Sequence, residues 1–475
     1  MSKKSKNKSK SLGFRKYLVI TLTIISIIVL GLVYFINVLP LEYFIVLSIL
    51  LFIIDIIVIV LLLSQNSLKN IIGGLLSLVL IVGMIFGINY ELNTLDFFKQ
   101  FGFNEYKNEH YNVYVLKTSN YEKLNDLKNK TIGHLDIEKF KGLNKTIDKL
   151  HNKFKFDGKI YDDVNELIND LITLKIDAIV LEDAQIEILK EENFNEYNLL
   201  KSIYSDEVEL SIKRKEVNKD ILKDTYNIYI SGIDTYGNIT KVSRSDVNML
   251  VSVNPVKKEI LLTNIPRDYY VKLHSFNEYD KLTHAGIYGI DESIGTIEDL
   301  LDTKIDYYVK VNFTSLIDIV NALDGISVNS KYSFTSIDGY TFNKGNNYLD
   351  GNKALSFARE RKAFKDGDRV RGENQQLVLT AIINKCLSSK IITNYNDILK
   401  AMKGKFITNI KDDDITKLIK NQISNNSSWN ISSISVNGVD AYDYVYSYKK
   451  NKLYVMKPIE KTVDNAKIKI KEVIE

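Results

Sequence analysis

The chain has 475 residues, enough for two or three domains, and 45% of them are hydrophobic, which is ample for packed cores. Its 63 Lys and Arg against 59 Asp and Glu give a net charge of +4, a weak excess that excludes no class of partner. The single cysteine, Cys386, excludes an internal disulfide framework and a cysteine-based zinc site, and its apolar surroundings predict a small buried core residue.

Residues 1–16 form a basic tail without acidic residues, and three long apolar runs follow it. The runs cover roughly Tyr17–Leu39, Tyr43–Leu63 and Ile71–Tyr90, each close to the ~20 residues that a helix needs to cross a bilayer. Three spans in series do not fit a cleaved signal peptide, which has one short apolar region. Residues 17–90 are therefore predicted to form three transmembrane helices, with buried helices of a soluble domain as the alternative.

The basic residues predict the orientation in the membrane. Residues 1–16 carry seven Lys and Arg, which favours a cytoplasmic N-terminus. The first loop, near Pro40–Glu42, has no Lys or Arg, whereas the second carries Lys69. Three crossings then place everything after about residue 91 outside the cell. Asp55 lies inside the second span, where an acid is either functional or simply paired with another helix.

The part after the spans divides into regions of different pattern. Residues 91–103 indicate a linker, and residues 104–222 alternate strand-length apolar runs with helical spacing, which predicts a small α/β accessory domain. Residues 223–390 predict a mixed α/β domain with its sheet between helices. Residues 391–475 are expected to add the helical segments "YNDILKAMK" and "DDITKLIKNQI", the strand "WNISSISV" and a Lys-rich, partly disordered tail.

Arginine is scarce in this lysine-rich chain, and its placement is uneven. Of eight arginines, four lie within "FARERKAFKDGDRVRGENQQ", and Arg244 and Arg267 precede this stretch in the same domain. Lysine and arginine are equal as bulk charge but differ at a planar, bidentate contact with phosphate or carboxylate. The cluster predicts a site for an oxyanion, with a surface salt bridge as the alternative for any single arginine.

Two aspartates are predicted to lie beside these arginines. Asp234 ends one predicted strand, and Asp246 opens the next one after a polar loop. Neighbouring strand ends bring the two carboxylates together, where they repel each other unless a cation lies between them. Mg²⁺ typically takes one or two carboxylates plus phosphate oxygens, so the pair predicts a magnesium site. Arg244 is two residues from Asp246 and shares its face on an extended segment.

Five motifs occur in order and together resemble the LytR–CpsA–Psr family over about residues 225–390. They are "GID...RSDVNMLVSVNP", "LLTNIPRDYYV", "KLTHAGIYG", "DYYVKVNFTSLIDIVNALDGISV" and "ARER...GDRVRGENQQ". The three spans, the additional outer domain and "KLTHAGIYGIDESIGT" are most similar to the streptococcal capsule-type branch of that family.

The resemblance implies a membrane-anchored phosphotransferase. Its donor would be a glycopolymer on a polyprenyl-pyrophosphate carrier, either capsular polysaccharide or a teichoic-acid-like polymer, and its acceptor peptidoglycan, joined through a phosphodiester bond. Phosphoryl transfer needs positioning and charge neutralisation more than covalent help, which agrees with the predicted site. The alternatives are a polyprenyl-pyrophosphate pyrophosphatase and a non-catalytic membrane sensor of envelope polymer assembly. No pattern in the chain indicates nucleic-acid binding.

The resemblance also implies roles for individual residues. Asp234 and Asp246 would hold Mg²⁺, with Mn²⁺ as the alternative ion. The residues that would bind the pyrophosphate are Arg244, Arg267, Lys281, Arg359, Arg361, Arg371 and Gln375. The catalytic set would be Asp234, Arg244, Asp246, Arg267, Arg359 and Arg361.

Two positions depart from the family pattern. Arg369 takes the place of an aromatic residue, and Asn374 takes the place of an arginine before the paired glutamines. Arg369 is therefore either an extra phosphate contact or a surface charge. His284, close to Lys281, is expected to be packed or hydrogen-bonded near the site, with a role as base as the alternative. The sequence assigns no general base.

Overall fold

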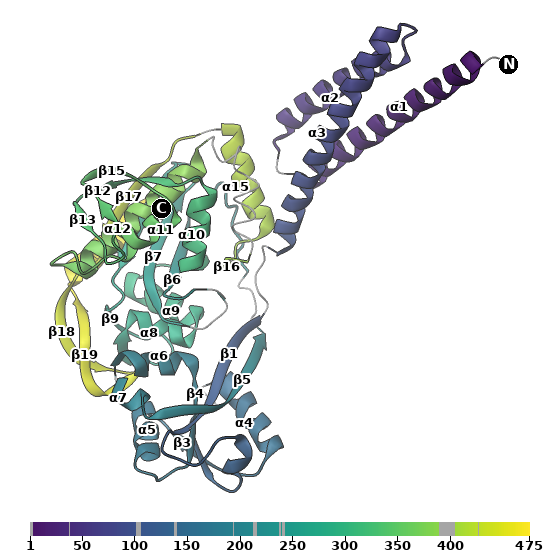
Figure 1. The fold of residues 1–475 in the computed structure, drawn as a ribbon. Coiled ribbons are helices and arrows are strands. Elements are labelled where there is room, and N and C mark those ends of the chain that lie inside the picture. Colours follow the sequence, from purple (N-terminus) through teal and green to yellow (C-terminus); the bar gives the residue numbers. More distant parts are fainter. Residues whose placement is uncertain are drawn as a thin grey trace. The chain divides into compact units, whose positions relative to one another are not determined.

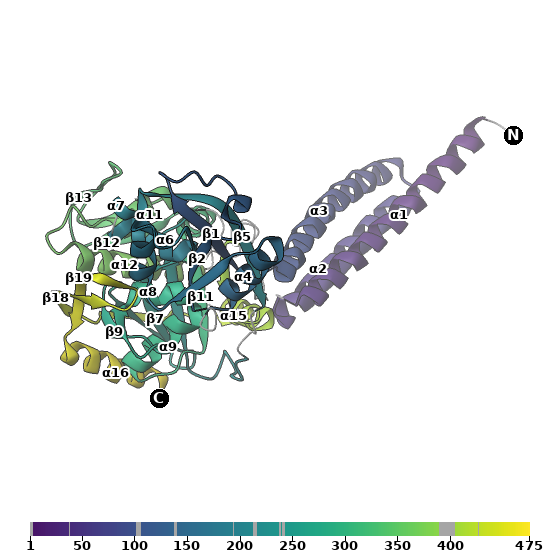
Figure 2. The same cartoon turned by 90° about the horizontal axis from the view of Figure 1, so that it is seen from below.

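A computed structural model of the chain describes residues 3–37, 39–100, 106–136, 140–192, 194–211, 216–236, 239, 243–388, 404–425 and 427–475. The chain forms two compact units, whose elements are drawn in Figures 1 and 2. The first unit contains Met1–Gly102, Cys386–Lys403 and Lys411–Ser428, and the second contains Phe103–Lys385, Gly404–Ile410 and Trp429–Glu475. The expected helix "YNDILKAMK" lies outside the described residues.

Three helices of the first unit are long and apolar enough to cross a membrane. They are α1 (Lys3–Ile36), α2 (Leu41–Leu63) and α3 (Ser67–Gln100). Their apolar spans confirm the three predicted transmembrane segments. Helix α3 continues through most of the expected linker at 91–103. The predicted helix α15 (Asp412–Asn425) belongs to the same unit.

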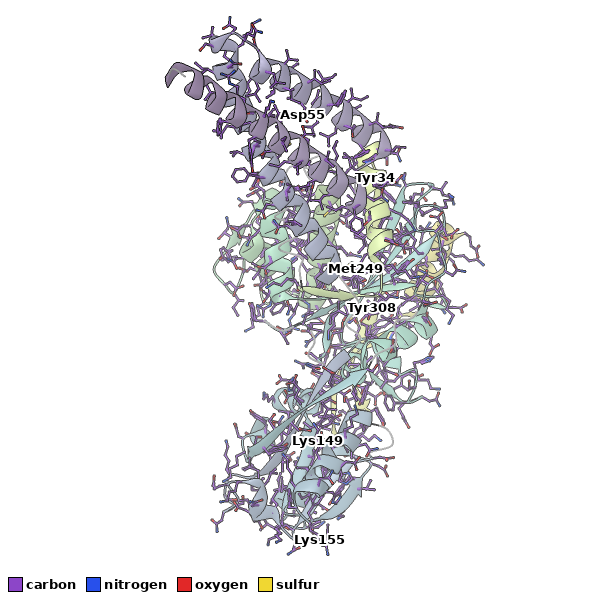
Figure 3. All side chains as sticks on the ribbon, turned by 90° about the vertical axis from the view of Figure 1, so that its right-hand side faces the viewer. Tyr34, Asp55, Lys149, Lys155, Met249 and Tyr308 are labelled. Atoms are coloured by element: carbon purple, nitrogen blue, oxygen red, sulfur yellow. The ribbon has the colours of Figure 1, made fainter. Side chains whose placement is uncertain are left out.

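Close packing holds the three apolar helices together. Leu22 and Leu62 are fully buried between them. Gly73 allows α3 to approach α2, because a Cβ there would lie 2.8 Å from the backbone nitrogen of Leu62. Asp55 on α2 is only 9% exposed, so this acid faces the packed interior of the helices (labelled in Figure 3).

Residues 106–211 form the accessory domain that the alternating pattern predicts. Its strands are β1 (Tyr106–Leu116), β2 (Thr131–Leu135), β3 (Asp157–Tyr161), β4 (Ala178–Glu182) and β5 (Leu200–Ser211). Its helices are η1 (Leu124–Leu127), α4 (Lys141–Lys153), α5 (Val164–Ile172), α6 (Asp183–Glu192) and α7 (Phe194–Tyr197). The sheet order is β3-β2-β4-β1-β5, with β3, β2 and β4 parallel. Strand β4 is buried at every position, as its unbroken apolar run predicts for a central strand.

The C-terminal domain, which begins at residue 226, is built on a mixed six-stranded sheet of order β16-β11-β6-β7-β8-β17. The strands are β6 (Tyr226–Ile233), β7 (Ser245–Asn254), β8 (Glu259–Ile265), β11 (Tyr307–Asn312), β16 (Phe406–Thr408) and β17 (Asn430–Ser435). Strands β6, β7 and β8 are antiparallel neighbours, and β11 runs parallel to β6. The sheet is the mixed α/β arrangement that the sequence predicts.

Helices and smaller strands surround this sheet (Figure 1). The helices are α8 (Leu282–Ala285), η2 (Gly286–Tyr288), α9 (Ile290–Leu301), α10 (Phe313–Ala322), α11 (Gly351–Arg359), α12 (Gly367–Leu387) and α16 (Glu460–Ile474). The smaller strands are β9 (Tyr270–Lys272), β10 (Tyr279–Lys281), β12 (Ile326–Ser330), β13 (Phe334–Thr335), β14 (Thr341–Phe342), β15 (Gly345–Leu349), β18 (Gly438–Val445) and β19 (Tyr448–Pro458).

One face of the sheet is tightly packed. Side chains alternate between the two faces of a strand, and Tyr229 on β6 and Leu250 on β7 are fully buried in a core that includes residues of α9 and α16. Helix α16 contributes Val463, Ala466 and Ile470 to this core. The remaining face is turned toward α10, α11 and α12.

The Lys-rich C-terminal segment was expected to be partly disordered, and the structure corrects this expectation. It forms the β18–β19 hairpin followed by α16. Val463, Ala466 and Ile470 recur three and four residues apart, so they lie on one face of a helix whose other positions are mostly polar. Because the segment contains many lysines, its composition alone does not reveal this apolar face.

Candidate functional site

An apolar cavity of about 420 Å³ lies between the sheet and helices α10, α11 and α12. Its apolar lining includes Ile230, Met249, Val311, Leu316, Leu355 and Leu379. Met249, labelled in Figure 3, faces this cavity, whereas its neighbour Leu250 belongs to the packed core on the other face. The cavity therefore offers room for an apolar chain beside a well-packed sheet.

Charged side chains line the same cavity, and they come from one edge of the sheet, from the end of α11 and the residues after it, and from α12. They are Asp234, Asp246, Arg267, Arg359, Glu360, Arg361, Lys362 and Arg371. Because β6 and β8 end where the antiparallel β7 begins, Asp234, Asp246 and Arg267 lie at the same edge. Five of the eight side chains are cationic and three are anionic, so the cavity carries an excess of positive charge.

The structure brings Asp234 and Asp246 together, as the predicted strand ends require. Ile233 pairs with Ser245 across β6 and β7, and the two aspartates are the residues that follow this pair. Burial raises the pKa of Asp234, and the negative charge of Asp246 raises it further. The two carboxylates are thus close enough to feel each other's charge.

Arg267 forks between two carboxylates. Its Nη1 lies 3.1 and 3.2 Å from the two carboxylate oxygens of Asp246, and its Nε lies 3.2 Å from Oδ2 of Asp268. Burial lowers the pKa of Arg267, but Asp246 and Asp268 outweigh this effect, so that the pKa is raised overall. Thr283 also donates to Asp246 through its hydroxyl, at 3.2 Å. These bonds fix the position of Asp246.

The arginines of the 357–376 stretch are also held by neighbours. The guanidinium of Arg359 lies over the ring of Phe313, 4.2 Å from its centroid, and 3.9 Å from Oδ1 of Asp234. Arg361 and Arg371 both contact Oδ1 of Asp368, at 3.3 and 3.1 Å. The three guanidinium groups are therefore pre-positioned along one wall of the cavity.

The other predicted phosphate-binding residues have different surroundings. Gln375 lines the apolar cavity. Arg244 is half-buried; burial lowers its pKa, and the charge of Asp246 offsets part of the effect. Lys281 is 6% exposed, and its Nζ lies 3.0 Å from Oε1 of Glu192 and 3.6 Å from Oδ1 of Asp268.

The residues that depart from the family pattern have packing contacts. Arg369 donates from Nη2 to the carbonyl oxygen of Gly438 at 2.8 Å. Asn374 is buried and donates from Nδ2 to the carbonyl oxygen of Phe357 at 3.2 Å. His284 is buried, with Nδ1 2.7 Å from Oδ1 of Asp280, so it is packed and hydrogen-bonded as expected.

Asp234 and Asp246 fit an ion that takes few protein ligands. Within the part of the chain that the structure describes, no group of three or more His, Cys, Asp and Glu side chains has the arrangement of a metal site. Two carboxylates that repel each other beside a cavity with an excess of cationic side chains match the coordination of Mg²⁺, which takes one or two carboxylates and completes its shell with phosphate oxygens and water. The residues therefore fit Mg²⁺ bound together with a phosphate ligand.

Several residues of the site were missed by reading the sequence. Asp268 and Asp368 hold arginines in place, and each carried a local signal, since Asp268 follows Arg267 and Asp368 precedes Arg369. Glu192 carried no such signal, because it lies 75 residues before Arg267 in a different domain.

The fold and the site define an α/β protein whose cavity combines an apolar lining with an excess of cationic side chains. Comparison with known proteins places it in a family. The LytR_cpsA_psr family matches residues 196–462, more than half of the chain, and the chain belongs to this family. The family predicted from the five motifs is thereby confirmed.

Named relatives match about two fifths of the chain. The chain is 36% identical to the polyisoprenyl-teichoic acid–peptidoglycan teichoic acid transferase TagU of Enterococcus faecalis, over 43% of this chain and 68% of that protein. It is 36% identical to TagU of Bacillus subtilis, over 43% of this chain and 65% of that protein. Among solved structures it is similar to Bacillus subtilis TagV, with 28% identity and a TM-score of 0.46 over 53% of this chain and 98% of that chain.

The two faces of β7 lead to a matched pair of substitutions. Met249→Trp places a larger side chain into free space, so we expect the free energy of unfolding to change by less than about 1.5 kcal/mol. Leu250→Trp forces the same side chain into a filled core and should cost about 1–3 kcal/mol or more. Thermal unfolding of the full-length protein in detergent measures both. Equal destabilisation by the two changes would contradict the assignment of the cavity.

Proposed function

We propose that this chain is a phosphotransferase that moves a glycopolymer from a polyprenyl-pyrophosphate carrier to peptidoglycan, forming a phosphodiester bond. The observation that carries the proposal is that one cavity combines an apolar interior with a cluster of arginines. A ligand with a long apolar chain and a diphosphate matches both parts. The relatives named teichoic acid–peptidoglycan transferases support this class of reaction. Their names favour a teichoic-acid-type polymer over a capsular polysaccharide.

The arrangement assigns a role to each part of the cavity. The polyprenyl chain would lie against Met249 and the helices, with the pyrophosphate against Arg359 and Arg361. The acceptor hydroxyl oxygen forms a bond to the phosphorus that carries the glycopolymer. The bond from this phosphorus to the bridging oxygen breaks, polyprenyl phosphate leaves with the electron pair, and the hydroxyl proton passes to water. Guanidinium groups fixed by Asp246 and Asp368 stabilise the charge that develops on the phosphate oxygens.

The proposal includes Mg²⁺, with Mn²⁺ as the alternative ion, held by Asp234 and Asp246. When bound, the ion would neutralise phosphate oxygens of the donor. Asp246 is fixed by Arg267 and Thr283, whereas Asp234 is 43% exposed and has freedom to adjust to the ligand.

Two arginines of the same stretch provide a test with its own control. Arg361→Ala removes a guanidinium that lines the cavity, so we expect transfer to fall by about 10²-fold or more. Arg369→Ala removes only the bond to Gly438 and should change transfer by less than about threefold. The assay follows labelled lipid-linked glycopolymer and isolated peptidoglycan with the purified full-length protein. Normal transfer by Arg361→Ala would contradict the proposal.

The same assay separates the transferase from its alternatives. A pyrophosphatase releases labelled product at the same rate with and without peptidoglycan, and a sensor binds the lipid donor without turnover. A transferase forms the phosphodiester only when peptidoglycan is present.

Removal of divalent cations tests the proposed ion. We expect EDTA to abolish transfer and added Mg²⁺ to restore it. Asp234→Asn removes one ligand charge, so the Mg²⁺ concentration needed for half-maximal transfer should rise by about tenfold or more. Asp318→Asn, which affects a partly exposed ion pair with Lys405, is the control and should leave this concentration unchanged. Full activity in EDTA would overturn the metal assignment.

The proposed reaction requires the C-terminal domain to lie outside the cell, which agrees with the orientation predicted from the basic N-terminal tail. In a Cys386→Ser background, Lys304→Cys at an exposed position should react with a membrane-impermeant maleimide in intact cells. Lys69→Cys, in the first turn of α3, should react only after the cells are opened. The opposite labelling pattern would contradict this orientation.

A further inference from the structure

A second cavity of about 500 Å³, the polar cavity, lies beside the apolar one, and seven of its nine lining residues are charged. The two cavities share Arg267, Arg361 and Lys362 in their linings. The lining of the second cavity also includes Lys281, Tyr454 and Glu192. Four of its side chains are cationic and three are anionic, so its charges nearly balance. Such a cavity suits a ligand rich in hydroxyl groups better than a second polyanion.

Glu192 comes from the accessory domain, at the C-terminal end of α6. Its carboxylate contacts Lys281 at 3.0 Å and is 15% exposed. Lys281 in turn lies 3.6 Å from Asp268, which holds Arg267. A continuous series of ion pairs thus leads from the accessory domain to an arginine that lines both cavities.

Apolar contacts hold α6 in this place. Ala184 and Ile188 of α6 pack with Ile287, Val445 and Tyr448 of the C-terminal domain, and all five are buried. Figure 1 shows α6 beside α8. Glu192 is therefore carried by a helix that is fixed against the C-terminal domain.

We infer that the polar cavity binds the acceptor sugar and that the accessory domain completes this subsite with Glu192. The inference rests on the proposed function. In the in-line displacement described above, the entering hydroxyl and the leaving polyprenyl phosphate lie on opposite sides of the phosphorus. With the polyprenyl chain in the apolar cavity and the phosphates at Arg267 and Arg361, the hydroxyl enters from the polar cavity. Its proton passes to water in that cavity.

Glu192 and Tyr454 offer the groups that sugars need, a carboxylate that accepts hydrogen bonds from hydroxyls and a phenol that donates or accepts. Lys281, held by Glu192 and Asp268, adds a donor. These three residues come from α6, β10 and β19, so the subsite is incomplete without the accessory domain.

The test varies donor and acceptor separately with the full-length protein. Glu192→Gln should raise the KM for a soluble peptidoglycan fragment about tenfold. The KM for the lipid-linked donor should rise less than the KM for the acceptor fragment. Glu192→Asp, which keeps the charge, should restore part of the affinity. Glu166→Gln, an exposed glutamate elsewhere on the accessory domain, should behave as wild type.

Three outcomes would overturn the inference. An unchanged acceptor KM in Glu192→Gln would show that Glu192 does not contact the acceptor. An equal rise of the donor KM and the acceptor KM would indicate a general structural role. If Glu192→Gln raises the donor KM more for donors with a longer glycan, the polar cavity binds the glycan of the donor and not the acceptor. If Glu192→Gln fails to fold, Tyr454→Phe tests the same cavity from its other wall by the same criteria. If the wild-type protein forms no phosphodiester at all, the proposed function fails instead.

Discussion

Unequal packing of the two faces of one sheet is the constraint on which the site depends. Tyr229 and Leu250 are fully buried on one face, whereas Ile230 and Met249 border free space on the other. An empty apolar cavity costs stability, because its lining lacks contact partners. Helices α10 and α11 instead pack closely on each other, because Gly351 leaves no room for a Cβ against the carbonyl oxygen of Ile317. The contact between α10 and α11 holds the two helices away from the sheet. The apolar cavity therefore stays open.

The ion pairs at the charged edge of the sheet orient side chains of the site more than they stabilise the fold. Replacing a buried ion pair by apolar residues is often neutral or stabilising, so the fork of Arg267 between Asp246 and Asp268 is poorly explained as a device for holding the fold. What the fork achieves is a fixed direction for Asp246 and a fixed plane for the guanidinium. Lysine, a flexible point charge, provides neither, which explains why a lysine-rich chain places arginine here.

Much of the fold was accessible from the sequence because local patterns decide it. The apolar runs of β6, β7 and β8, and the loop that joins Asp234 to Asp246, fix which residues meet at the sheet edge. Helix α16 was not predicted from the sequence, because lysines interrupt its apolar face. Only its packing against the sheet reveals this face. Glu192 was not predicted as a site residue for a different reason. Its ion pair with Lys281 joins residues far apart in the sequence, and no local sequence pattern predicts such a contact. Arg359, Arg361 and Arg371 line the cavity, whereas the contact of Arg369 with Gly438 was visible only in three dimensions.

The position of α16 at the end of the chain affects how the protein folds during synthesis. Strands β6 to β8 lie near the middle of the chain, yet their packed face is covered by residues 463–470, and Thr225 donates a hydrogen bond to the carbonyl oxygen of Ile474, 249 residues away. Long-range contacts of this kind form slowly, because distant segments must first meet. During synthesis the sheet therefore stays uncovered until the last helix of the chain has been made. A chain that lacks residues 460–474 would expose the apolar face of β6 and β7 that α16 covers.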